Sequence, residues 1–135
     1  MRVKRSLVGI AVFKVSKDPD VVKIDMTLAG IKLPSSYSTT RYSRYYPLLD
    51  EVVRSLGIPL HNAFYRDFIC YYNKKPLLCR VFLSRDGKRV EYIVLAAFQA
   101  GVLSSIVHAL EKAGWSKVFL LEIAATRHSP WRHIE

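Results

Sequence analysis

Residues 77–97, LLCRVFLSRDGKRVEYIVLAA, are two apolar runs joined by Arg85-Asp86-Gly87-Lys88. Asp-Gly between two such runs predicts a β-hairpin, because a type I′ turn needs a positive φ at both central residues. A tip at Asp86-Gly87 fixes the register, in which Leu83 opposes Val90, Val81 opposes Tyr92, Cys79 opposes Val94, Phe82 opposes Glu91 and Arg80 opposes Ile93. We therefore expect two central strands, with Arg80 diagonal to Glu91 and paired with it.

A helix and one more strand are predicted after this hairpin. Residues 99–113 carry apolar side chains at helical spacing, and Gly114 ends the pattern. Residues 117–124 have the nearly continuous apolar pattern of a buried strand. A strand–helix–strand connection of this length favours a right-handed parallel crossover, so the last strand is expected to lie parallel to the strand before the helix.

The chain before the hairpin predicts three more strands and one helix. The strands are expected at residues 7–15, 21–28 and 63–72, and the helix at residues 46–56. The 21–28 strand rests on a strict alternation of apolar and polar side chains. If residues 73–76 turn the chain, Cys70 faces Cys79 across the next strand pair, and the two cysteines form either a disulfide or two buried thiols.

These elements give the order ββαβββαβ and an α+β fold class. We expect a mostly antiparallel mixed sheet of about six strands, packed by two helices on one face. The first seven elements occur in an order that is similar to that of longin- or profilin-like domains, and such a fold does not by itself imply a function. One domain is expected over residues 1–125, followed by a polar C-terminal tail at 126–135.

The charge balance favours a polyanion as the partner. The net charge is +10, from 21 basic and 11 acidic residues, and the excess is spread along the chain. Nucleic acid is the first expectation and an anionic membrane surface the second. No apolar run approaches the length of a membrane span, and the N-terminal run lacks a signal-cleavage pattern, so we expect a cytoplasmic protein. The scarcity of Asn and Gln is a trait of thermophile proteins.

Two groups of residues are candidate phosphate-binding sites. The first is the hydroxyl-rich segment 35–44, with Ser38, Arg41 and Arg44 placed just before a predicted helix N-terminus. The second consists of the basic residues of the two hairpin turns and of the strand between them: Lys74, Lys75, Arg80, Arg85, Lys88 and Arg89. Successive turns of a meander point to opposite ends of the sheet, so the turn clusters are not expected to merge. The alternative for these residues is ordinary solvated charge.

We therefore expect a small basic nucleic-acid-binding protein, a homodimer, that contacts the phosphates of DNA, RNA or another phosphate-containing ligand. No glycine-rich phosphate loop, CxxC, HExxH or GxSxG motif is present, and we predict no catalytic residue, metal site or cofactor. The carboxylates within predicted strands that we consider for catalysis are those of Asp25, Asp67 and Glu91. One alternative is a nuclease or other phosphoester-processing enzyme acting on a nucleotide or nucleic acid. Another is a homo-oligomeric assembly module that uses an edge strand and Trp131 of the tail.

Overall fold

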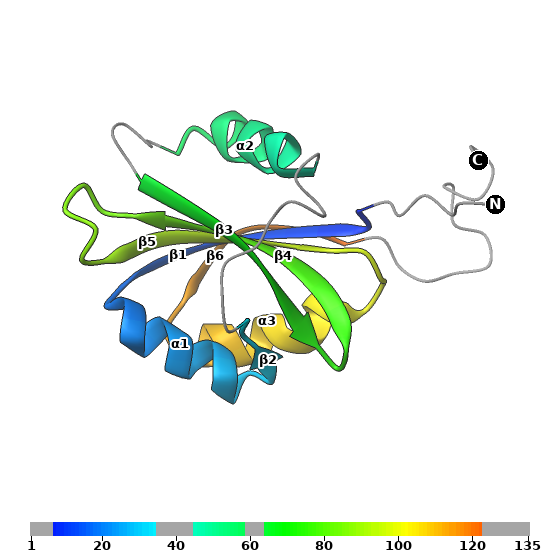
Figure 1. Cartoon of the computed structure of the whole chain (residues 1–135). Helices are drawn as coiled ribbons and strands as arrows, with labels where there is room; N and C mark the ends of the chain where they lie inside the picture. The colour runs from blue at the N-terminus through cyan, green and yellow to red at the C-terminus, as the bar shows by residue number, and fades with distance from the viewer. Residues whose placement is uncertain (1–6, 35–44, 59–63, 123–135) are drawn as a thin grey trace.

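The computed structural model describes residues 7–34, 45–58 and 64–122, and within them it has one six-stranded sheet (Figure 1). The strand order is β2-β3-β4-β5-β1-β6, and every neighbouring pair is antiparallel. The strands are β1 (Gly9–Lys17), β2 (Ile31–Lys32), β3 (Phe64–Tyr72), β4 (Lys75–Leu83), β5 (Val90–Ala97) and β6 (Ser116–Glu122). The helices are α1 (Pro19–Leu28), α2 (Tyr46–Ser55) and α3 (Val102–Lys112). The predicted α+β class is confirmed, while the expected boundary at 125/126 and the tail lie outside the described residues.

Helices cover both faces of the sheet, whereas two helices on one face were expected. α1 and α3 lie against one face and α2 against the other, as Figure 1 shows. The larger core cluster joins α1 and α3 to the sheet and includes Phe13, Leu103 and Trp115. The smaller cluster joins α2 to the opposite face and includes Leu49 and Val53. The sheet is therefore the middle of three layers, and each face has its own environment.

The expected strand at 21–28 is wrong, because this segment is helix α1. The Asp18 side chain caps the helix by accepting a hydrogen bond from the Asp20 backbone N–H at 2.8 Å, and Pro19 occupies the first turn. Val22 and Met26, four residues apart, are the buried pair. The apolar residues between and after them are exposed. The element order is therefore βαβαβββαβ, and the resemblance to longin- or profilin-like domains does not hold at the second element.

The expected hairpin of β4 and β5 is present, but the expected type I′ turn is wrong, because Gly87 has a positive φ of 74° and Asp86 does not. A β-bulge also changes the register of the hairpin. Leu83 faces Val90 as expected, and the register then shifts so that Phe82 faces Tyr92. Glu91 is the extra residue, since it has no partner between these pairs. Arg80 therefore faces Val94 rather than Ile93, and lies on the face that α2 covers. The strand after α3, β6, runs parallel to β5, as expected, but β1 lies between them in the sheet.

The β3–β4 turn is tighter than expected and places the two cysteines diagonally, so they do not face each other directly. Asn73 and Lys74 both have positive φ, 48° and 64°, as a two-residue hairpin turn requires. Cys70 consequently faces Leu77, and Cys79 lies two residues further along β4. Both cysteines are buried free thiols, which decides between the two alternatives. Burial, followed by the neighbouring thiol, raises the pKa of Cys79, so it stays protonated at neutral pH.

Two hydrogen bonds attach the N-terminus of α3 to the edge strand β6. The Glu122 carboxylate accepts hydrogen bonds from the backbone N–H groups of Leu103, at 2.9 Å, and Ser104, at 3.3 Å. A carboxylate at this position complements the positive end of the helix dipole. Gly9 of β1 lies beneath the same helix, because a Cβ built on it would stand 2.8 Å from Leu103 Cδ1 and 3.3 Å from the Leu121 carbonyl oxygen.

Replacement of Gly9 by alanine is expected to destabilise the protein. The added methyl group has no room against a fully buried leucine and a backbone oxygen, so Gly9→Ala should lower the free energy of unfolding by about 1–3 kcal/mol. Urea denaturation followed by circular dichroism measures the change. Ser116→Ala, an exposed strand position, is the control and should stay within about 0.5 kcal/mol of the parent. A stabilised Gly9→Ala variant would show that Leu103 moves aside.

Candidate nucleic-acid interface

The structure places the expected basic turn residues at opposite ends of the sheet. Lys74 lies in the β3–β4 turn and Lys75 begins β4 directly after it, while Arg85, Lys88 and Arg89 belong to the β4–β5 turn. The two turns point away from each other, as expected for a meander, so their charges form two separate groups. Several expected or possible contributors lie outside the described residues: Ser38, Arg41, Arg44, Arg2, Lys4, Arg5, Arg127 and Arg132.

Arg80 does not belong to an exposed basic strip, because it is buried and paired. Only 3% of the residue is exposed. Its Nε and Nη2 donate to the two carboxylate oxygens of Asp67 on β3, each at 2.6 Å, and its Nη1 donates to Asp50 on α2. The expected pairing of Arg80 with Glu91 is therefore wrong. Glu91 instead accepts a hydrogen bond from the Ser16 hydroxyl at 3.3 Å.

Two tyrosine rings complete the surroundings of this guanidinium group. Its Cζ lies 4.3 Å from the ring centroid of Tyr65 and 5.3 Å from that of Tyr46. The Tyr46 hydroxyl donates to the Phe68 carbonyl oxygen at 3.2 Å. Burial opposes the charge of Arg80, but the hydrogen bonds that it donates to Asp67 and Asp50 outweigh this effect and raise its pKa. Arg80 is thus a permanent cation that ties α2 to the sheet and is not exposed to a ligand.

The β4–β5 turn is built by hydrogen bonds to its exposed acidic residue, Asp86. The Asp86 carboxylate accepts from the Ser84 hydroxyl at 2.6 Å and from the Lys88 backbone N–H at 3.0 Å. These bonds hold the pKa of Asp86 below its usual range, the Ser84 hydroxyl first. Arg89 donates to the Ser16 carbonyl oxygen and so joins the turn to β1. Arg85 and Lys88 are exposed on either side of the tip.

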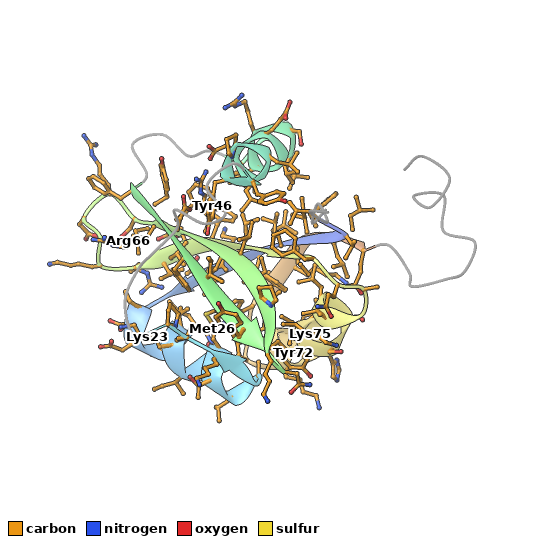
Figure 2. All side chains as sticks on the ribbon, turned by 45° about the vertical axis from the view of Figure 1, so that its right-hand side comes forward. Lys23, Met26, Tyr46, Arg66, Tyr72 and Lys75 are labelled. Atoms are coloured by element: carbon orange, nitrogen blue, oxygen red, sulfur yellow. The ribbon has the colours of Figure 1, made fainter. Side chains whose placement is uncertain are left out.

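A groove of about 820 Å³ opens between α1 and the β3–β4 part of the sheet, next to this turn. Figure 2 shows its two cationic residues, with Arg66 on β3 above Lys23 on α1, and Met26 beside Lys23. The rest of the lining is mostly apolar: Pro19, Val22, Leu33, Pro34, Phe64, Tyr65, Phe68, Val81, Leu83 and Val90, with Asp86 and Gly87 at the turn. Arg85 and Lys88 flank Asp86-Gly87, so four exposed cations lie around one end of the groove.

Sequence reasoning missed the residues that form this groove. Lys23 was assigned to the polar face of a strand that is in fact α1, so its position opposite Arg66 could not be inferred. The run Phe64-Tyr65-Arg66 is the one available signal, since exposed aromatic residues beside a cation are typical of surfaces that bind nucleic acid. We call the residues that line the groove, together with Arg85 and Lys88, the groove surface.

The carboxylates considered for catalysis have separate structural partners. Asp25 lies on α1, where it accepts from Lys17 Nζ at 2.8 Å and from Trp115 Nε1 at 2.9 Å. Asp67 forms an ion pair with Arg80, and Glu91 accepts a hydrogen bond from the Ser16 hydroxyl. Within residues 7–34, 45–58 and 64–122, no group of three His, Cys, Asp or Glu side chains could hold a metal ion.

Removal of the Asp67 carboxylate should destabilise the protein more than removal of the Asp50 carboxylate. The Asp67 side chain is 15% exposed and binds two guanidinium nitrogens, whereas that of Asp50 is 41% exposed and binds one. We expect Asp67→Asn to lower the free energy of unfolding by about 3–5 kcal/mol and Asp50→Asn by about 1 kcal/mol. Urea denaturation measures both, with the exposed α2 variant Glu51→Gln as an unaffected control. Equal losses at Asp67 and Asp50 would contradict the geometry.

Comparisons with known proteins give no relative from which a role could be transferred. Searches against protein-family models, curated proteins and solved structures find no match to this chain. Within the described ranges, none of the helices has the length and apolar character needed to cross a membrane. What can be said about function therefore comes from the arrangement of this chain's own residues.

Proposed function

We propose that this protein binds nucleic acid and that the groove surface makes its main contacts. The observation that carries the proposal is the convergence of four exposed cations, Lys23, Arg66, Arg85 and Lys88, from α1, β3 and one turn. Aromatic side chains lie among them. Phosphates bind lysine and arginine largely through charge, and aromatic rings stack on bases, so the combination suits a nucleic acid better than either feature alone.

The position of the neighbouring acidic groups supports this proposal. Asp86 is the acidic residue in the lining, and its carboxylate accepts two hydrogen bonds from within its own turn. Asp25 and Asp67 are engaged by Lys17 and Arg80. The Asp25 and Asp67 carboxylates are thus held by structural partners, and the exposed Asp86 offsets one of the four exposed cations, which leaves an excess of positive charge at the groove surface. The opposite end of the sheet carries Lys74 and Lys75, which do not line this groove.

Binding should weaken steeply with added salt and should depend on the β4–β5 turn. For single strands, the logarithm of the affinity falls with the logarithm of the salt concentration by about 0.7 per phosphate contact. We expect the double variant Arg85→Gln with Lys88→Gln to reduce this slope by about 1–2 units and to weaken binding at low salt. Fluorescence anisotropy with a labelled oligonucleotide measures both quantities.

The double variant Lys74→Gln with Lys75→Gln is the matched control, because it removes the same charge from the opposite end of the sheet. It should change the slope less than the Arg85 and Lys88 pair. Equal slopes for the two double variants would show that only total charge matters and would contradict a defined surface. Absence of salt dependence in the parent protein would contradict phosphate binding altogether.

A second candidate function, homo-oligomeric assembly, is favoured by the exposed edge strand β6. Within the described residues, β6 pairs only with β1, so its outer edge has no strand partner. Three large apolar side chains of this strand are exposed: Val118 by 43%, Leu120 by 36% and Leu121 by 58%. Natural sheets usually protect such an edge, and pairing with a second copy is one way to do so. No described feature similarly favours the nuclease alternative.

If two copies pair through β6, a charge on that edge should separate them. We expect Leu120→Lys to lower the molar mass measured by light scattering from that of a dimer to that of a monomer. The control is Leu28→Lys on α1, where the parent side chain is 81% exposed and lies away from β6; its mass should stay that of a dimer. A parent protein that is already monomeric at high concentration would contradict this second candidate.

A further inference from the structure

We propose that the groove between α1 and β3 holds one unpaired base, so that the protein prefers single-stranded over double-stranded nucleic acid. This inference rests on the proposed function and adds to it the form of nucleic acid that is bound. It depends on three features of the groove: its space and apolar lining, the exposed ring of Phe64, and the charges at its mouth.

The size and lining of the groove suit a flat ring system. Its volume of about 820 Å³ lies within the range of pockets that hold small organic ligands. The sheet contributes the side chains of Phe68, Val81 and Leu83, and α1 contributes Val22 and Met26. Phe68, Val81, Val22 and Met26 are buried, so this part of the groove belongs to the packed core and is formed before a ligand arrives. A base has two apolar faces that can be buried here.

Phe64 supplies an exposed aromatic ring at the groove. Residues alternate between the faces of a strand, so Phe64 lies on the same face of β3 as Phe68. Phe64 is 59% exposed, and no aromatic ring of the described residues stacks on it. Its neighbour Tyr65 lies against Arg80 and against Phe82, whose ring centroid is 6.3 Å away. Phe64 thus presents a ring to a ligand, while Tyr65 is held in place by the sheet.

The charges at the groove distinguish a nucleotide from an uncharged apolar occupant. Lys23 and Arg66 lie on opposite walls, one on α1 and one on β3 (Figure 2). Arg85 and Lys88 extend this positive region beyond the Asp86-Gly87 tip. A chain of phosphates carries one negative charge per nucleotide and complements such a row, whereas an apolar peptide or acyl chain would gain nothing from it. The charge arrangement therefore commits the groove to a nucleotide.

A double helix cannot use the groove in this way. In a duplex each base is stacked between its neighbours, so a base can enter a pocket only after it has been unstacked and unpaired, at a cost of a few kcal/mol. A single strand presents its bases without that cost. Phosphate contacts alone would not discriminate between the two forms, so any preference for the single strand would report on the groove.

The test compares three ligands of equal length: a single-stranded oligonucleotide, the same strand with abasic sites throughout, and the duplex. The parent protein should bind the first at least about tenfold more tightly than the second, since one stacked base contributes on this scale. Phe64→Ala should remove that preference and leave abasic and duplex binding within about twofold of the parent. Phe64→Trp should retain it. Leu121→Ala, an exposed apolar position on β6, should change none of the three affinities.

Each other outcome overturns a stated part of the argument. Equal, salt-dependent binding of the single strand and the abasic strand would overturn the base site and leave the proposed nucleic-acid function intact. Binding of none of the three ligands would overturn both. If Phe64→Ala changes no affinity, although the parent prefers the single strand, the base lies elsewhere and the groove has another occupant, such as an apolar peptide. Because Phe64 is mostly exposed, its variants are expected to fold, and their circular dichroism and urea midpoints verify this.

Discussion

A buried guanidinium group is the constraint that two layers of this molecule satisfy together. Arg80 lies in the middle of β4, in a strand that is otherwise apolar. A buried charge is tolerated only when it is paired and its donors are satisfied. Asp67 supplies one carboxylate from the neighbouring strand, and the second comes from Asp50 on α2, which lies across this face. The position of α2 thus follows from an electrostatic requirement as well as from its apolar stripe.

The two faces of the sheet consequently differ in what they leave exposed. On the α2 face, the ion network and the Tyr46 hydroxyl bond fill the space above β3 and β4. On the other face, α1 and α3 bury the β1 and β5 side chains, and the stretch of β3 near Phe64 stays uncovered by any described helix. The groove is the consequence of this unequal covering. Its walls are core residues, which makes it a fixed feature rather than a surface irregularity.

Sequence reasoning predicted those parts of the fold that local signals specify. Asp86-Gly87 placed the central hairpin, and the apolar stripes placed α2 and α3. The bulge at Glu91 escaped prediction because nothing local marks an extra residue in a strand. Residues 21–28 fit a period of two, yet Val22 and Met26 also fit a helix, and Asp18 followed by Pro19 is a helix-start signal that would have decided the matter. The partners of Arg80 are 13 and 30 residues away, so no spacing rule identifies them.

The difference between local signals and tertiary contacts also explains why net charge gave only a partial account of the candidate site. A charge of +10 counts every lysine and arginine alike, but the fold uses some of them internally. Arg80 is paired with two carboxylates and Lys17 with Asp25, and Arg89 donates a hydrogen bond to a backbone oxygen of β1. Lys23 and Arg66, in contrast, line one groove because α1 and β3 lie on its opposite sides. Their proximity is a property of tertiary structure, so composition can indicate a polyanion partner but cannot locate where it binds.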